Sequence, residues 1–111
     1  MTREQMHERE EQRERAILVF TPDQNESWQE EELYEELKEL SNTAGLDVVD
    51  YLVQHRNAPD AAYCIGKGKL AELSTLCAAR DADCVIFDHP LSPSQLHNLT
   101  NALDAKVLDK T

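Results

Sequence analysis

The sequence predicts a single α/β domain, with a mostly parallel sheet of about four strands that is flanked by helices on both faces. Short uncharged apolar runs, typical of strands covered on both sides, alternate along the chain with longer segments of helical periodicity. The chain has 111 residues, of which 41% are hydrophobic and 5% aromatic, so one aliphatic core of ordinary size is expected. Strands that alternate with helices of roughly 11 to 17 residues imply right-handed crossovers and parallel pairing.

The first fifteen residues predict an arm outside this core. Residues 1–15 contain only two apolar side chains, both methionine, among many Glu, Arg and Gln residues. Such a composition is typical of a frayed helix or a disordered arm. The predicted domain therefore comprises residues 16–111.

The first half of the domain predicts a strand, a helix and a second strand. Ala16–Phe20 is a buried strand, and the Thr-Pro-Asp sequence at residues 21–23 ends it. Residues 27–30 form a capping box, with Ser27 as the cap and Glu30 as its partner. Gly45 supplies the left-handed stop, and residues 47–53 form the second strand. The apolar stripe of this helix recurs every three or four residues at Leu33, Leu37, Leu40 and Ala44.

The second half repeats the alternation. Residues 61–65 predict a short extended piece before a glycine-containing turn, and residues 84–87 predict another buried strand. A helix lies between them, with its apolar positions at Leu70, Leu73, Leu76 and Cys77. The last strand is predicted at residues 106–109.

The helix before the last strand has the best-specified start in the chain. Ser92 is the cap, Pro93 occupies the first helical position and Gln95 completes a capping box, while Leu91 and Leu96 form a hydrophobic staple. Its buried face is expected at Leu96, Leu99 and Leu103.

Charge, hydropathy and cysteine content narrow the class of protein. The net charge of -11 counts against a nucleic-acid partner, but residues 21–40 alone hold eight acidic residues and one lysine, so another face can still meet phosphate. The sequence carries no long apolar run and no signal-peptide pattern, which predicts a cytoplasmic protein with no membrane contact. Three cysteines without C-x-x-C spacing predict buried free thiols and no metal site.

Residues 65–69, Ile-Gly-Lys-Gly-Lys, are the most informative segment. Two lysines beside a flexible glycine at a helix start form a local positive site in an acidic chain, suited to phosphate oxygens. The segment is not a Walker A motif, because Leu70 follows the lysine where Ser or Thr is required. Ligands of a parallel sheet gather beyond the carboxyl ends of its strands, here residues 21–23, 54–56, 88–90 and 109–111.

Five ordered blocks of this sequence resemble the amino-terminal domain of the HflX family of ribosome-associated GTPases. The resemblance runs from about residue 16 to the last residue and rests on Gln54-His55-Arg56, Pro59-Asp60, Ile65 to Lys69 with Glu72-Leu73, Phe87-Asp88 with Leu91 to Gln95 and Asn98-Leu99, and Val107 to Thr111.

This resemblance implies a non-catalytic module that precedes a helical hairpin and a GTPase domain, and that helps to bind the large ribosomal subunit and its RNA. It also implies GTP and Mg²⁺ as cofactors of the full-length family, with none in this chain. His97 and Lys110 stand where the family usually has arginine, so a bidentate phosphate contact is lost at both positions.

The candidate residues for a phosphate or RNA contact are Arg56, Gly66, Lys67, Gly68, Lys69, Asp88, Ser94, His97, Asn98 and Lys110. Some of them have a second interpretation: Gly66 to Lys69 as a solvated turn into a helix, Asp88 as a turn former, and Arg56 as a solvated cation. No catalytic residue is predicted, since a serine without a placed base is not a nucleophile. A nucleotide-binding domain that uses Gly66 to Lys69 for ATP or GTP is the alternative function.

Overall fold

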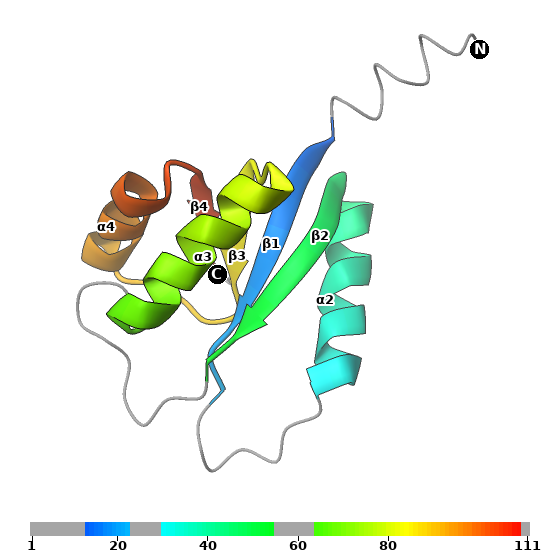
Figure 1. Ribbon diagram of the computed structural model, residues 1–111. Helices are drawn as coiled ribbons and strands as arrows, with labels where there is room; N and C mark the ends of the chain where they lie inside the picture. The colour runs from blue at the N-terminus through cyan, green and yellow to red at the C-terminus, as the bar shows by residue number, and fades with distance from the viewer. Residues whose placement is uncertain (1–12, 23–29, 55–63, 110–111) are drawn as a thin grey trace, which may run out of the picture.

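The computed structural model describes residues 13–22, 30–54 and 64–109, and within them one parallel sheet lies between two helical layers (Figure 1). The strands are β1 (Glu14–Phe20), β2 (Leu46–Val53), β3 (Cys84–Phe87) and β4 (Lys106–Leu108), in the order β2-β1-β3-β4. All three strand pairs are parallel. The predicted fold class is confirmed.

The central strand β1 is buried on both faces, as its apolar run predicted. Ile17 and Val19 belong to one core cluster and Leu18 and Phe20 to the other, because successive side chains of a strand point to opposite faces. Each of these four residues is at most 1% exposed.

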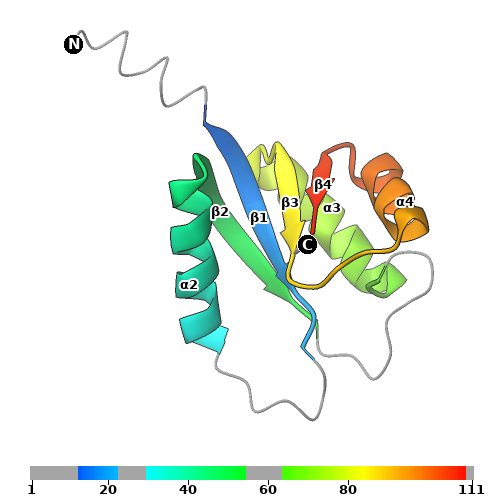
Figure 2. The same cartoon turned by 180° about the vertical axis from the view of Figure 1, so that it is seen from behind.

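The two faces of the sheet carry different numbers of helices. Helix α2 (Glu30–Thr43) lies on one face beside β2 and β1, whereas α3 (Lys67–Arg80) and α4 (Pro93–Leu103) cover the other face (Figures 1 and 2). The acidic helix α2 is therefore separated from α3 and α4 by the whole sheet.

Strand β1 begins two residues earlier than predicted, so Glu14 and Arg15 belong to the sheet rather than to the arm. Polar contacts hold this end of the strand. The Arg15 amide donates to Asp83 Oδ2 over 2.9 Å, and Glu14 Oε1 lies 2.7 Å from Lys106 Nζ on β4. Residues 1–12, the rest of the predicted arm, lie outside the described residues.

The prediction that Leu40 and Ala44 belong to a buried stripe of α2 was wrong. Leu40 is 60% exposed, and Ala44 is exposed beyond the end of the helix. The helix instead presents Tyr34 to the sheet, with its ring centroid 4.5 Å from that of Tyr51 on β2. This aromatic contact turns the buried side of α2 toward β2, because Tyr34 lies about 100° around the helix from Leu33.

The ends of the elements agree with the predicted signals where these are described. Gly45 has φ of 88°, the left-handed stop expected after α2. The Ser92 hydroxyl accepts from the Gln95 amide over 3.1 Å, and the Gln95 side chain accepts from the Ser92 amide over 3.0 Å, which confirms the capping box. The predicted capping box at residues 27–30 and the extended piece at residues 61–63 lie outside the described residues.

Candidate functional site

The carboxyl ends of the strands meet at one edge of the sheet, which we call the carboxyl edge. It carries Thr21 after β1, Gln54 after β2, Asp88 after β3 and Asp109 after β4. Helices α3 and α4 begin at the same edge, because α3 is the next element after β2, α4 is the next element after β3, and each runs back along the sheet (Figure 1). The candidate residues at positions 66–69, 88 and 94 are thus brought to one side of the molecule.

The predicted glycine turn is the first turn of α3. Gly66 is the residue before the helix, with φ of -67° and ψ of 161°, and its amide donates to Gln54 Oε1 over 3.1 Å. A Cβ atom at Gly66 would lie 3.5 Å from Gln54 Nε2, which is ordinary contact, so the position does not require glycine for space. Gln54 therefore fixes the start of α3 against the end of β2.

The start of α3 has no side-chain cap and no acidic residue in its first turn. The first amides of any helix lack intrahelical acceptors and carry partial positive charge. At α3 no residue of the first turn supplies a competing carboxylate. The arrangement favours an anion more strongly than the capped start of α4 does.

The two lysines of this turn differ in their surroundings. Lys69 is partly buried, and its Nζ lies 3.2 Å from Glu72 Oε2 one turn further along the helix. Lys67 is exposed and makes no ion pair within the described part of the chain. The positive charge available to a ligand at the start of α3 is therefore mainly that of Lys67.

Asp88 forms a network that joins the ends of β1 and β3. Its amide donates to Val19 O over 3.0 Å. Its carboxylate accepts from the Thr21 amide over 3.1 and 3.2 Å, and from the Thr21 hydroxyl over 3.1 Å. The side chain is 8% exposed. The carboxylate thus continues the ladder between two parallel strands where the main chain of β3 turns away.

His89 joins this network, although the sequence analysis did not single it out for this role. Its Nδ1 atom lies 2.9 Å from Asp88 Oδ1 and 3.2 Å from Thr21 Oγ1. The signal in the sequence was the Asp-His pair directly after a buried strand, at the edge where ligands of parallel sheets gather. No cluster of three or more potential metal ligands is found among the described residues.

The remaining candidates lie on α4 or outside the described residues. Ser94 is exposed in the first turn of α4, and Asn98 is half-buried one turn further along. His97 is exposed, with its Nε2 atom 3.1 Å from Asn101 Nδ2. Arg56 and Lys110 fall in ranges that the structure does not describe.

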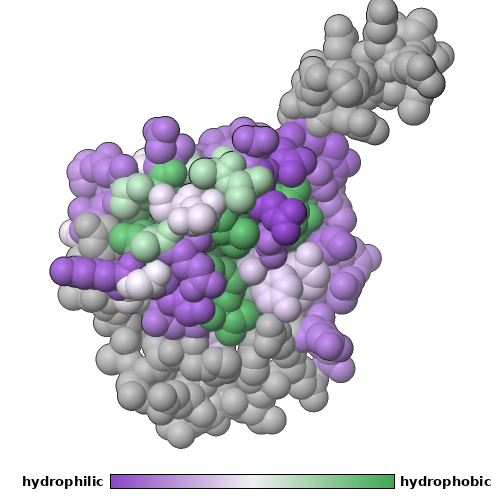
Figure 3. All heavy atoms as spheres, viewed as in Figure 1, coloured by the Kyte–Doolittle hydropathy of each residue, from purple (hydrophilic) through white to green (hydrophobic). Residues whose placement is uncertain are grey.

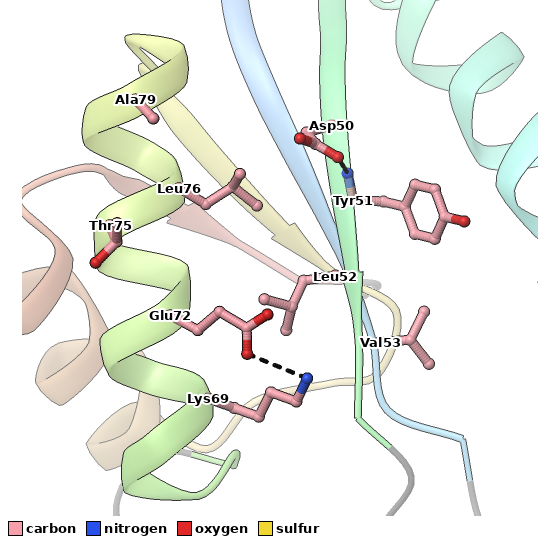
Figure 4. A pocket seen from close by; sticks show the side chains of 9 residues that line it. All are labelled: Asp50, Tyr51, Leu52, Val53, Lys69, Glu72, Thr75, Leu76 and Ala79. Atoms are coloured by element: carbon pink, nitrogen blue, oxygen red, sulfur yellow. Dashed lines mark hydrogen bonds and ion pairs between the residues drawn. The ribbon is translucent and has the colours of Figure 1, made fainter.

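A groove of about 780 Å³ lies between α3 and β2, next to the start of α3 (Figure 4). Leu52 and Leu76 point into it from opposite sides, and the Lys69–Glu72 ion pair projects across one end (Figure 4). Figure 3 shows hydrophobic side chains exposed between α3 and β2, with hydrophilic residues beside them. Asp50 also lines the groove, so two carboxylates border its apolar floor.

Burial raises the pKa of two cysteine thiols in this domain. Cys77 lies on the buried side of α3 and Cys84 at the start of β3, and both are free and buried. For Cys84, burial and the nearby Glu14 carboxylate together raise the pKa to about 11. Both thiols stay protonated at neutral pH and belong to the core, as predicted.

No helix in the described ranges is both long and apolar enough to cross a membrane.

Residues 31–111 match the family described as GTP-binding GTPase N-terminal, and the chain belongs to this family. The chain is 42% identical over 106 residues to the GTPase HflX of Caldanaerobacter subterraneus subsp. tengcongensis, and 34% identical over 109 residues to that of Escherichia coli. Each alignment covers 96% of this chain and 24% of the relative. The resemblance to the amino-terminal domain of HflX is therefore confirmed.

Solved structures share the fold. A GTP-binding protein from the archaeon Sulfolobus solfataricus, in complex with GDP, is similar with a TM-score of 0.61 and 20% identity, over 87% of this chain and 27% of that protein. The SsGBP variant G235S is similar with a TM-score of 0.63 and 21% identity over 87% of this chain. This chain thus spans about a quarter of the length of the relatives it matches.

Proposed function

We propose that this chain is the amino-terminal module of a longer HflX-like GTP-binding protein, and that it contacts RNA of the large ribosomal subunit through the start of α3. One observation carries the RNA contact: α3 begins without a cap or an acidic residue in its first turn, and Lys67 is exposed there. Free helix amides with an adjacent cation form an anion site suited to a backbone phosphate. The module itself performs no chemistry.

The position of the acidic helix supports this orientation. The outer side of α2 carries five exposed glutamates, Glu31, Glu32, Glu35, Glu36 and Glu39. They lie on the face of the sheet opposite to α3 (Figure 2). A phosphate backbone at the start of α3 is separated from them by the sheet, and the Debye length at physiological salt is only about 8 Å.

The groove beside α3 gives less support to the alternative, a nucleotide-binding domain. Its polar border includes the carboxylates of Asp50 and Glu72, which repel phosphate, and Glu72 engages Lys69. Titration of GTP or ATP while the amide NMR shifts of Gly66 and Gly68 are followed separates the two functions. Small unsaturated shifts at millimolar nucleotide agree with the proposal, whereas a saturable shift would establish the nucleotide site.

Co-sedimentation with large ribosomal subunits across a range of salt concentrations tests the RNA contact. We expect salt-sensitive association that Lys67→Ala weakens about three- to tenfold, with the slope against log salt smaller by roughly one. Lys69→Ala has a smaller effect, because its Nζ is already paired with Glu72. The matched control is Lys38→Ala, since Lys38 lies over the Tyr34 ring on the opposite face.

Unchanged association of the double variant Lys67→Ala/Lys69→Ala would show that the start of α3 does not belong to the interface.

A second variant tests the proposed orientation of the domain on the RNA. Glutamine at Glu32, Glu35 and Glu39 should leave association nearly unchanged at physiological salt and speed it modestly at low salt. A strong loss of association in this triple variant, with an unchanged circular dichroism spectrum, would make α2 the binding surface instead.

A further inference from the structure

Strand β2 lies at one edge of the described sheet, with its outer side turned away from β1. The strand spans eight residues, Leu46–Val53, and stands first in the order β2-β1-β3-β4. Figure 1 shows β2 as the strand furthest from β4. An edge strand of this length carries a row of main-chain amides and carbonyls with which another extended chain can pair. The chemistry of this edge therefore decides what can bind there.

The Asp50 carboxylate covers the middle of the outer edge. The Gln54 amide donates to Phe20 O on β1 over 2.9 Å, so this amide points inward. Main-chain amides alternate in direction along a strand, which directs the Tyr51 amide away from β1. That amide donates to Asp50 Oδ1 over 2.8 Å, while Asp50 Oδ2 accepts from Arg80 Nε over 3.1 Å. The outer edge is thus covered by a carboxylate that an arginine of α3 holds in place.

The groove between α3 and β2 runs along the same edge. Figure 4 shows Asp50 and Leu52 directed toward α3, whereas Tyr51 and Val53 point to the other side of the strand. Leu76 of α3 lies across the groove from Leu52. A strand added beside β2 would lie about 4.8 Å from it and alternate its side chains in the same way. Every second side chain of the added strand would therefore enter the groove.

The border of the groove is more acidic than basic. Asp50 and Glu72 line it, and Asp47 is exposed further along β2. The neighbouring cations are already paired, because Lys69 Nζ lies 3.2 Å from Glu72 Oε2 and Arg80 contacts Asp50. Three carboxylates thus face two cations, in a chain of net charge -11. The charges of this surface favour a basic partner.

A basic partner compensates for the loss of this cover, whereas a neutral strand does not. A strand carbonyl that accepts from the Tyr51 amide displaces the Asp50 carboxylate, which then lacks one of its donors. An arginine of the partner replaces that donor with a charge-assisted hydrogen bond. A second copy of this chain would instead bring its own Asp47 and Asp50 to the same edge, where like charges repel.

We propose that the outer edge of β2, with the groove beside it, binds an extended basic peptide of another protein as an additional strand. The main chain of the peptide pairs with β2, and an aliphatic side chain packs between Leu52 and Leu76. A basic side chain of the peptide contacts Asp50. This inference goes beyond the proposed function and does not rest on the RNA contact at the start of α3.

Titration of a synthetic peptide, followed by the amide NMR spectrum of the chain, tests the proposal. The probe has eight residues, the length of β2. It carries an arginine, a valine and a second arginine at every other position and threonine elsewhere, so that these three side chains face the groove. We expect saturable shifts at Tyr51 and Leu52. Glutamine in place of both arginines should weaken binding about three- to tenfold.

Two N-methylated versions of the probe test strand addition itself. Each version is methylated on one alternate set of main-chain amides, and the two sets point to opposite edges of the added strand. One version should lose binding, because its methyl groups face β2, and the other should keep it. Both versions carry the same composition and number of methyl groups, so a difference between them reports main-chain pairing.

Three variants of the chain locate the basic side chain. Ala79→Arg places a second guanidinium beside Asp50 and should weaken binding about three- to tenfold. Ser74→Arg is the matched control, since it adds the same charge on the exposed side of α3 outside the groove, and should change the affinity less than about twofold. Asp50→Ala should bind the arginine and glutamine probes within about twofold of each other.

Four outcomes would overturn the proposal. The first is the absence of saturable binding at millimolar probe, and the second is equal binding of the two N-methylated versions. The third is a set of shifts confined to α2, which would assign the probe to the acidic helix. The fourth is a change of the β2 amide shifts with the concentration of the chain alone, which would assign the edge to a second copy.

Discussion

Replacing Asp88 tests whether this candidate site residue orients a ligand or stabilises the fold. Its carboxylate is 8% exposed and accepts from the amide and the hydroxyl of Thr21, which is fully buried. Hydrogen bonds to a charged group contribute about 1.5 to 3 kcal/mol each at most, and the two bonds to one residue are not additive. We therefore expect Asp88→Ala to lower the free energy of unfolding by about 2 to 3 kcal/mol.

Asp88→Asn is the matched variant, because it keeps an oxygen that can accept from Thr21 but removes the charge. Asp88→Asn should lower the free energy of unfolding by about 1 kcal/mol. Urea unfolding followed by circular dichroism measures both values, and for a chain of this length Asp88→Ala should lower the melting temperature by roughly 10 °C. Asp47→Ala on the exposed side of β2 is the control and should cost less than about 0.5 kcal/mol.

A double-mutant cycle with Thr21→Val isolates the contact, since valine removes the hydroxyl and keeps the amide. A coupling energy of about 1 kcal/mol is expected for the hydroxyl–carboxylate bond. If Asp88→Ala left the stability unchanged and abolished ribosome association, the carboxylate would be a ligand group and the structural argument would be refuted.

Five further variants test the cap of α4, two glycines and a buried thiol. Ser92→Ala should cost about 1 kcal/mol in urea unfolding because it removes the cap of α4, whereas Ser94→Ala, exposed in the same turn, should be nearly neutral. Gly45→Ala should destabilise by about 1 kcal/mol at its φ of 88°, and Gly68→Ala should stabilise by roughly 0.5 to 1 kcal/mol inside α3; the same sign for both would contradict the backbone argument. For Cys84, whose pKa is raised to about 11, the folded state keeps a proton that the unfolded state releases near pH 9, so stability should fall between these values, and less steeply in Cys84→Ala.

The features that sequence predicted best are encoded by neighbouring residues. The start of α4 is specified by Ser92, Pro93 and Gln95 alone, and their local contacts do not depend on distant parts of the chain. The burial of β1 on both faces followed from its uninterrupted apolar run, which is typical of a central strand rather than an edge strand. The family resemblance likewise rested on ordered local blocks.

The features that sequence missed depend on distant contacts. The exposure of Leu40 follows from the contact of Tyr34 with Tyr51, seventeen residues further along the chain, which the 3.6-residue period cannot reveal. Asp81 and Asp104 end α3 and α4 in the left-handed conformation, each with φ of 51°, where the sequence offers no glycine. Aspartate tolerates that conformation better than most residues, but it is equally common in turns of other kinds.

The candidate site was predicted in position more than in detail. The carboxyl edge followed from the parallel topology, and position 88 was placed there in advance, whereas positions 66–69 were predicted as a helix start without being assigned to that edge. The difference between an exposed Lys67 and an ion-paired Lys69 was not predicted. Glu72 nevertheless follows Lys69 by three residues, a helical spacing that favours an ion pair. Asp88 was assigned two roles, and its contacts with Thr21 favour the structural one.

Within the part of the chain that the structure describes, the opposite edge, where the strands begin, carries more basic side chains, but these are paired with acceptors in the protein. Arg80 donates to Asp50 Oδ2 over 3.1 Å, and Lys106 Nζ lies 2.7 Å from Glu14. Arg15 donates from Nε to Arg80 O over 2.8 Å. A phosphate at this edge would have to compete with those acceptors, so each cation contributes little net affinity there. Lys67 has no such competitor among the described residues, because α3 starts without an acidic residue in its first turn. Among the described residues, the number of basic side chains therefore favours the edge where the strands begin, but their pairing favours the carboxyl edge as the proposed RNA-binding surface.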